Sequence, residues 1–352
     1  MRVEIVQRGN DDVESWHLQC FKDPETVDAL RQLGVEVALR SSVDEITPDA
    51  EVVGVGIRRN HNYERLFDKT DKLDPAVTVL MLDWSDMAEV GPVERRTLLN
   101  HRIDGICKSK LFRDPSLYAK SSARFLWGGE APGEHHRRFR ACRPEFYGTA
   151  DFVAPLPLDT NKLGLWPSSG TWRRVDPLKQ QKVLPDKPID VMFVGSVDYE
   201  NTPIQQHRHL CCDSMERLPR SWSVVCHRGK VFSPRMYFTL SRISKIIVSP
   251  WGWGAVSYRD FETVFSASAL LKPPSSYIKT FPDILPLAFT CRPDFSDLEA
   301  ECTELLDTWN YHYAVLLCLR ETTIRETSPQ AVAAYFATLF SSMKPKEVST
   351  RQ

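Results

Sequence analysis

The chain has 352 residues, of which 42% are hydrophobic and 26% are charged, so it corresponds to about two globular domains and excludes a wholly disordered protein. The formal net charge of −1 gives no overall field that would attract nucleic acid or anionic lipid. No apolar run reaches the ~18–20 residues of a membrane span, and the first residues lack the apolar core of a signal peptide. Nine cysteines without a CxxC pair fit free thiols in a reducing compartment. We expect a cytoplasmic protein that touches a membrane peripherally at most and has no nucleic-acid partner.

Short apolar runs typical of β-strands alternate with helix signals through the first half of the chain. Strands are expected at 3–6, 35–39, 51–57, 77–83, 105–108 and 150–155. The clearest helix signal is Asp23, which can cap a helix whose first turn contains Pro24 and whose end is marked by Gly34. Continuously apolar strands are typical of parallel sheets, which are buried on both faces. The pattern therefore predicts an α/β domain.

A second α/β series follows a stretch that has no regular pattern. From about 156 to 188, prolines, glycines, serines and charged residues predict an interdomain connection. Strands are then expected at 189–194, 222–226, 245–249 and 269–272, and helices at 203–218, 234–243 (with Ser233 as N-cap), 256–266, 296–320 and 329–343. We assign residues 1–165 to a first domain, 166–188 to a linker, 189–325 to a second domain and 326–352 to a C-terminal helix and tail.

The segment 244–283 is the part of the sequence that is most informative about chemistry. A buried strand leads into the turn 250–254, and the helix that follows carries Arg259 and Glu262 in its first turns. Ligands of open α/β sheets bind beyond the carboxyl ends of the strands, where helix N-termini favour phosphate. Gly252 lets the backbone approach a ligand, Arg259 can bind a diphosphate, and Glu262 can accept hydrogen bonds from ribose hydroxyls. A tight turn with an ordinary surface ion pair would have the same spacing.

Five motifs in this half are similar to those of a known group of enzymes. They are Val194-Gly195-Ser196, Ser244-Lys245, Ser249-Pro250-Trp251-Gly252, Ser257-Tyr258-Arg259-Asp260-Phe261-Glu262 and Leu270-Leu271-Lys272-Pro273. With them, the run from 190 to 283 resembles the donor-binding half of GT-B-type glycosyltransferases, and most of all the exostosin-like and spore-maturation-type family 1 enzymes. It covers about a quarter of the chain. Ala267-Ser268-Ala269 stands where that family often has a glycine, and the first half carries no such motif.

The resemblance implies an α/β fold of two Rossmann-like domains that face each other across a cleft, with closing C-terminal helices. The first domain would bind the acceptor and the second a nucleotide-diphosphate sugar, with no essential metal. The resemblance further implies that Glu262 contacts the ribose or the sugar and that a nearby basic residue binds the diphosphate. We expect the donor to be bound by Gly195, Ser196, Arg228, Ser249, Gly252, Ser257, Tyr258, Arg259 and Glu262.

The basic residues after the second strand of this domain have two interpretations. His227, Arg228 and Lys230 follow that strand and can face a nucleotide, or they can be ordinary solvated loop residues.

A catalytic base is harder to predict. An inverting transferase needs a group in the acceptor domain that takes the proton of the acceptor hydroxyl, and Asp83 stands at the end of an apolar strand, with Asp86 soon after. A lone aspartate in this place is also a common helix N-cap. His61, with Arg58 and Arg59, is a weaker candidate, and a retaining enzyme would need no such base.

Three further patterns are weaker signals. Gly54-Val55-Gly56 lacks the third glycine of a dinucleotide fingerprint, so we expect no nicotinamide cofactor. His207, His209, Cys211 and Cys212 do not share one helix face and therefore predict no closed metal site. The basic stretch 134–143 could bind an anionic acceptor, a phospholipid surface or RNA, or could be a solvated helix face.

The function predicted from the sequence is that of a glycosyltransferase, either a hexosyl- or a pentosyltransferase. It would move a sugar from a nucleotide-diphosphate sugar to a hydroxyl of a glycan or lipid-linked acceptor, as in polysaccharide biosynthesis. The main alternative is a non-catalytic nucleotide- or sugar-binding α/β protein. A third hypothesis, an RNA-associated protein, rests on the stretch 134–143, and the neutral overall charge disfavours it.

Overall fold

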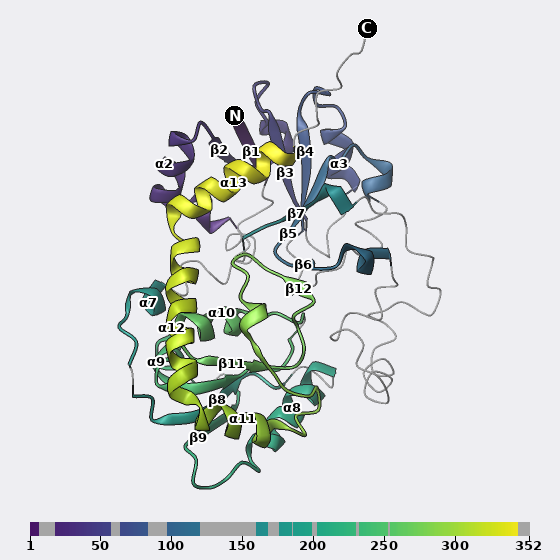
Figure 1. The fold of residues 1–352 in the computed structure, drawn as a ribbon. Helices are drawn as coiled ribbons and strands as arrows, with labels where there is room; N and C mark the ends of the chain where they lie inside the picture. The colour runs from purple at the N-terminus through teal and green to yellow at the C-terminus, as the bar shows by residue number, and fades with distance from the viewer. Residues whose placement is uncertain are drawn as a thin grey trace.

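The computed structural model describes residues 1–6, 18–57, 64–83, 97–119, 160–167, 176–184, 186–198, 203–229, 232–252 and 254–343. These residues form two parallel β-sheets with helices around them, one sheet in each half of the chain (Figure 1). The α/β fold class predicted from the sequence is therefore confirmed.

The first sheet contains six of the described strands, all parallel, in the order β2-β1-β3-β4-β5-β7. They are β1 (Arg2–Val6), β2 (Glu36–Arg40), β3 (Val52–Ile57), β4 (Thr78–Asp83), β5 (Gly105–Lys108) and β7 (Leu163–Leu165). Every residue of β3 and β4 is buried, as the continuous apolar sequence of these central strands predicts.

Helices α2 (Pro24–Gln32) and α3 (Glu64–Thr70) accompany this sheet. The predicted capping of α2 is confirmed, because the Asp23 carboxylate accepts a hydrogen bond from the Thr26 N–H at 2.9 Å. Gly34 follows the helix with a φ of 74°, a conformation that glycine adopts without strain. Short 3₁₀ turns occur at Gln19–Phe21, Val43–Glu45, Pro115–Ala119, Thr160–Lys162 and Leu285–Leu287.

The second sheet contains five of the described strands, also parallel, in the order β13-β11-β10-β8-β9. The strands are β8 (Ile189–Gly195), β9 (Val224–Arg228), β10 (Ser244–Val248), β11 (Ala269–Lys272) and β13 (Phe289–Thr290). The helices of this half are α7 (Asp176–Gln180), α8 (Pro203–Met215), α9 (Pro234–Arg242), α10 (Tyr258–Phe265), α11 (Leu298–Asp307) and α12 (Trp309–Glu326). The strand order reverses between β8 and β10, which makes this the topological switch point of the sheet.

The carboxyl edges of the two sheets face each other. Strand β6 (Leu111–Phe112) follows the end of β5, and β12 (Ile278–Lys279) follows the end of β11; the two pair as an antiparallel ladder between the sheets (Figure 1). The Arg113 guanidinium adds a two-pronged ion pair with Asp283, at 2.9 and 3.0 Å, and donates to two backbone carbonyls of the second half.

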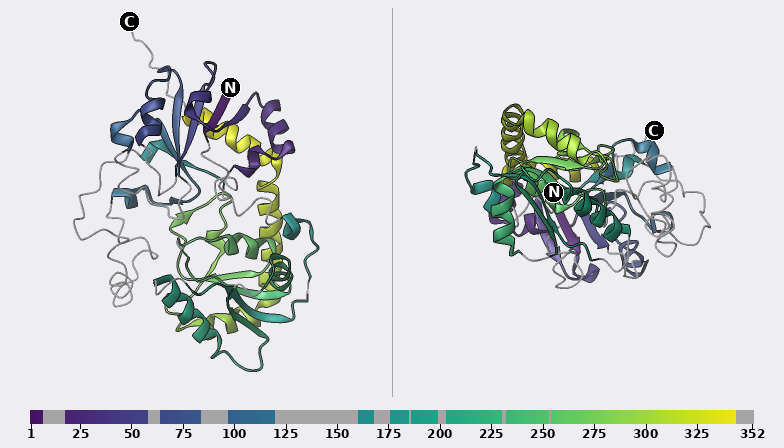
Figure 2. Two further views of the ribbon diagram at one scale, coloured as in Figure 1. Left: turned by 180° about the vertical axis from the view of Figure 1, so that it is seen from behind. Right: turned by 90° about the horizontal axis from the view of Figure 1, so that it is seen from below.

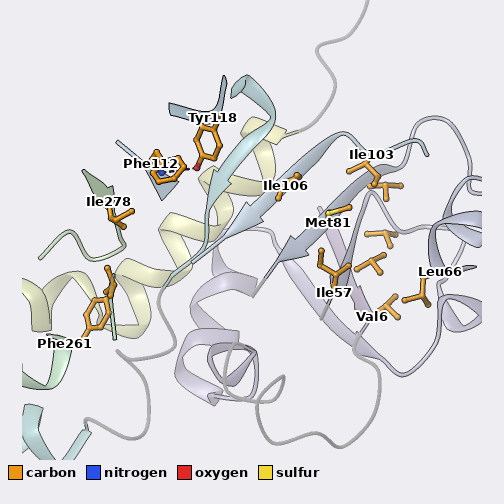
Figure 3. Packing of buried hydrophobic residues seen from close by; sticks show 14 of the residues in the cluster. Val6, Ile57, Leu66, Met81, Ile103, Ile106, Phe112, Tyr118, Phe261 and Ile278 are labelled. Atoms are coloured by element: carbon orange, nitrogen blue, oxygen red, sulfur yellow. Dashed lines mark hydrogen bonds between the residues drawn. The ribbon is translucent and has the colours of Figure 1, made fainter. Parts of the chain in front are cut away.

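Apolar packing continues across this contact. Phe112 and Tyr118 of the first half belong to the same buried cluster as Phe261 and Ile278 of the second half (Figure 3). The Tyr118 hydroxyl accepts a hydrogen bond from the Phe112 N–H at 3.0 Å.

The last helices connect the halves a second time. Helix α12 packs on α10 and β11 of the second half, and α13 (Pro329–Met343) returns to pack on α2 of the first half (Figures 1 and 2). On α13, Phe336 packs against Trp166 and Phe21, with ring centroids 4.8 and 4.7 Å away. The C-terminal helix is therefore part of the core of the first domain.

Several boundaries differ from the sequence predictions. Strand β7 and helix α7 lie within 156–188, so that stretch is not entirely a connection, and β7 completes the first sheet. The strand expected at 222–226 extends through Arg228, and the helix expected at 296–320 is two helices, α11 and α12. The strand expected at 150–155 lies outside the described residues. None of the helices in the described ranges is both long enough and apolar enough to cross a membrane.

Candidate functional site

The candidate site lies at the switch point of the second sheet. At a switch point the connections of two adjacent strands leave toward opposite faces, and ligands of open α/β sheets bind in the space between them. Here the chain leaves β8 at Gly195 and β10 at Val248. The predicted donor residues around these two strand ends are Gly195, Ser196, Ser249, Gly252, Ser257, Tyr258 and Arg259, with Glu262 one helical turn further along α10.

Arg259 is the one strongly basic side chain of this group, and its guanidinium is incompletely bonded. Nη2 donates to the Val194 carbonyl at 2.9 Å, and the guanidinium carbon lies 4.9 Å from the centre of the Phe193 ring. Nε and Nη1 are buried without a hydrogen-bond partner among the described residues. An unsatisfied buried donor costs about 1–3 kcal/mol, so an acceptor that reached these two N–H groups would bind favourably.

Gly195 leaves the space that the Arg259 guanidinium occupies. A Cβ atom at this position would stand 2.3 Å from Nη2 of Arg259 and 3.5 Å from the Phe193 ring. Any larger residue at position 195 therefore displaces the arginine. The end of β8 and the start of α10 can pack this closely because Gly195 has no side chain.

Gly195→Ala is expected to weaken the binding of a nucleoside diphosphate about tenfold, because the new methyl group pushes Arg259 off the Val194 carbonyl. The atom that must move is the end of a flexible side chain, so the melting temperature should change little. Isothermal titration calorimetry and thermal unfolding measure the two effects. In the double variant Gly195→Ala/Arg259→Ala the glycine substitution should add no further loss of affinity, and an additive loss would contradict the mechanism.

Glu262 lies deeper than its predicted role suggests, with only 3% of its surface exposed. It lies beside Tyr237 of α9: burial, reinforced by the negative charge of Glu262, raises the pKa of the Tyr237 phenol above its ordinary range. At the end of β9, the Nδ1 atom of His227 is also buried without a described hydrogen-bond partner, and its ring packs edge-on against Phe232. Sequence reasoning placed His227 after a strand and did not identify Tyr237.

A buried ion pair stabilises the turn between β10 and α10. Asp260 pairs with Lys272, the last residue of β11, and also accepts hydrogen bonds from the Ser249 hydroxyl at 2.5 Å and the Ser257 N–H at 3.1 Å. Ser249 and Ser257 therefore use polar groups to fix the backbone around Asp260. The Ser-x-x-Asp spacing at 257–260 is typical of a capping box, and this sequence signal could have identified the contact between Ser257 and Asp260.

Positive charge from both halves gathers near this ion pair. Burial lowers the pKa of Lys272, and the charges of Lys110 and Arg259 act in the same direction, while Asp260 opposes them. Lys110 belongs to the first half, directly after β5. Lys110 of the first half therefore lies close enough to Lys272 of the second half for their charges to interact.

The structure does not bring Arg228 to Arg259. Its guanidinium faces α8, where it forms ion pairs with Asp213 at 2.6 Å and Glu216 at 2.8 Å and a hydrogen bond with His209. These pairs raise the pKa of Arg228 above its usual range. A contact between Arg228 and a donor stays a prediction that no feature of the described site supports.

Asp83 ends β4 and is paired with Lys108 of the neighbouring strand, both almost completely buried. Asp83 is 3% exposed, so it serves at least to hold the two strand ends together. Its role as catalytic base stays a prediction. The other base candidates, Asp86, His61, Arg58 and Arg59, and the basic stretch 134–143, lie outside the described residues.

Within the described ranges, one group of side chains has metal-ligand geometry: Asp68, Asp71 and His101, whose ligand atoms lie within 4.8 Å of one another. Asp68 belongs to the last turn of α3, Asp71 follows that helix and His101 precedes β5, so the group lies at the amino edge of the first sheet, opposite the switch-point site. His101 Nδ1 is already 2.8 Å from an Asp71 oxygen. This group has no connection to the candidate site.

No protein-family model matches the sequence, and no curated protein matches it. Solved structures do match it. An α-glucosyltransferase in complex with UDP and a 13-mer DNA containing an HMU base aligns over 98% of this chain and 100% of its own, with a TM-score of 0.51 and 11% sequence identity. The same coverage and identity, with a TM-score of 0.50, hold for an α-glucosyltransferase in complex with UDP. An α1,3-fucosyltransferase aligns over 97% of this chain with a TM-score of 0.45 and 15% identity.

These likenesses concern the fold. The chain has the two Rossmann-like domains of the GT-B type, and the strand order of each large sheet reverses at one switch point. The predicted fold is confirmed over nearly the whole chain, although the sequence motifs that suggested it occupy only the second half.

Proposed function

We propose that the protein is a glycosyltransferase that takes its sugar from a nucleotide-diphosphate donor bound at the switch point of the second sheet. The observation that carries the proposal is the bonding of Arg259, which lies beside the carboxyl end of β8. Its Nε and Nη1 are buried and have no hydrogen-bond partner among the described residues. A diphosphate supplies the acceptor oxygens and the negative charge that such a group requires. The fold likeness to transferases bound to UDP is consistent with this assignment.

In the reaction, the bond between the anomeric carbon and the diphosphate oxygen breaks, and a bond from the acceptor oxygen to that carbon forms. The electron pair of the broken bond stays on the diphosphate, and the acceptor hydroxyl loses its proton. Arg259, with the positive end of the α10 dipole, would stabilise the charge that develops on the leaving group, which is the usual dominant contribution of such a site. Asp83 is the proposed proton acceptor if the reaction inverts configuration.

The finer assignment also belongs to the proposal. A hexosyl or pentosyl unit would pass to a hydroxyl of a glycan or lipid-linked acceptor in the cytoplasm, as in the exostosin-like and spore-maturation-type enzymes that the second half resembles. We propose no metal ion and no cofactor beyond the donor. Since one similar structure contains DNA with an HMU base, hydroxylated DNA is a necessary comparison among acceptors.

The proposal predicts that one of the nucleotides UDP, GDP, ADP, CMP and TDP raises the melting temperature. A ligand at 100 times its dissociation constant adds about 2.7 kcal/mol to the free energy of unfolding, which corresponds to a shift of at least a few degrees. The shift should persist in EDTA. The sugar nucleotides of the stabilising base are then incubated with glycan, lipid-linked and hydroxylated-DNA acceptors, and release of the free nucleotide is measured.

The three outcomes separate the candidate functions. A stabilising nucleotide together with acceptor-dependent release supports the transferase. A stabilising nucleotide without transfer to any acceptor favours the alternative, a non-catalytic nucleotide- or sugar-binding protein. No stabilisation by any nucleotide would contradict both.

A further inference from the structure

Helix α8 contributes a buried arginine that joins the two loops of the switch point. Arg208 is only 7% exposed. Nη1 donates to the Ser196 carbonyl at 2.6 Å, and Nε donates to the Trp251 carbonyl at 3.3 Å. One rigid group is thus bonded to the loop after β8 and to the loop after β10.

The neighbouring residue supports the same loop. The His207 ring stacks on the Trp251 ring, with centroids 4.8 Å apart and planes 18° apart, and its Nε2–H donates to the Pro293 carbonyl at 3.0 Å. Burial lowers the pKa of His207 to about 3, so the ring is neutral and packs as an aromatic group. Trp251 is therefore held by its carbonyl through Arg208 and by its ring through His207.

The loop is also fitted closely to the arginine. A Cβ atom at Gly252 would stand 3.3 Å from Nη2 of Arg208, which is tighter than an ordinary van der Waals contact. A glycine here allows the backbone to pass directly over the guanidinium. A side chain that belongs to neither loop is therefore in contact with both of them.

We propose that Arg208 is a positioning residue of the donor site: by bonding the Ser196 and Trp251 carbonyls, it fixes the separation of the two loops between which the diphosphate binds. This inference rests on the proposed function. Arg208 acts through the loops rather than on the ligand, because both named bonds go to backbone carbonyls of the protein. A planar guanidinium can bond two carbonyls in fixed directions, whereas a lysine ammonium is a flexible point charge.

The test uses the full chain and compares Arg208→Ala, Arg208→Lys and Gly252→Ala with Arg217→Ala. Arg217 is an exposed arginine just beyond the same helix, bonded to the Ser214 hydroxyl at 2.9 Å, and serves as the matched control. The dissociation constants of UDP, GDP, ADP, CMP and TDP are measured by calorimetry at a temperature at which each variant is folded. Melting temperatures are recorded without ligand.

Arg208→Ala is expected to raise the dissociation constant at least tenfold, Arg208→Lys to restore part of the loss, and Arg217→Ala to change nothing. If Arg208 served only the stability of the fold, its substitution would leave the nucleotide affinity of the folded protein unchanged. Binding within twofold of the wild type in Arg208→Ala would overturn the inference. If that variant does not fold, an unchanged dissociation constant in both Arg208→Lys and Gly252→Ala would overturn it.

The wild type distinguishes this inference from the proposal it rests on. If the unmodified chain binds none of the five nucleotides, the proposed function fails and the inference fails with it. If the unmodified chain binds one of them and the Arg208 variants bind it equally well, only the inference fails.

Discussion

Arg259→Ala is expected to abolish the thermal shift by nucleoside diphosphates and to reduce transferase turnover at least a hundredfold. The Arg259 guanidinium lies against Gly195 at the end of β8, and its Nε and Nη1 have no hydrogen-bond partner within the described structure. Charge-assisted hydrogen bonds to a buried cation are worth about 1.5–3 kcal/mol each, and two of them account for a loss of this size. Thermal unfolding with nucleotide and a coupled assay of nucleotide release measure the effect.

The same variant should not destabilise the free protein. Alanine removes a contact with Phe193 and a hydrogen bond to the Val194 carbonyl, each worth about 1 kcal/mol, but it also removes two buried donors that have no described partner. We expect a melting temperature within about 2 °C of the wild type, or higher. Arg235→Ala, at an exposed arginine on α9, is the control for charge alone. A variant that melts well below the wild type and still binds nucleotide would contradict the assignment.

Asp83→Ala is expected to lower the free energy of unfolding by about 3–5 kcal/mol, because it removes one partner of a buried ion pair and leaves the charge of Lys108 buried. The two residues lie opposite each other at the ends of β4 and β5. Urea unfolding measures the change. This loss is large compared with the total stability of an ordinary domain.

The double variant Asp83→Leu/Lys108→Met separates the structural role of this pair from catalysis. Replacing both charges with apolar side chains of similar size should recover most of the stability, since desolvation of an ion pair costs as much as it gains. If Asp83 is the catalytic base, the recovered protein binds nucleotide normally but remains inactive. Full activity in the recovered double variant would exclude Asp83 as the base.

The sequence predicted the repeating elements well because each rests on local chemistry. Asp23 caps α2, Ser233 caps α9 with a bond of 3.2 Å to the Met236 N–H, and β11 begins and ends as predicted. Capping and continuous burial depend on neighbours in the chain, which a sequence displays directly.

Partners across the fold could not be predicted in this way. Nothing near Arg228 in the sequence indicates that it turns to Asp213 and Glu216, and nothing near Asp83 indicates Lys108. Arg208 was not identified because an arginine in a helix has no local signal of burial. These contacts join strands and helices that are distant in the chain, so they depend on the topology and not on local patterns.

The return of α13 to the first domain bears on how the chain acquires its structure during synthesis. Phe336 and Phe340 complete the aromatic cluster around Trp166, so that without α13 one side of the Trp166 ring is not covered by these aromatic rings. Ribosomes release a chain from its N-terminus, and most domains fold in that order. Here the earlier domain must keep an apolar face uncovered until residues 329–343 have emerged. The first domain is therefore complete only after the second domain has been synthesised.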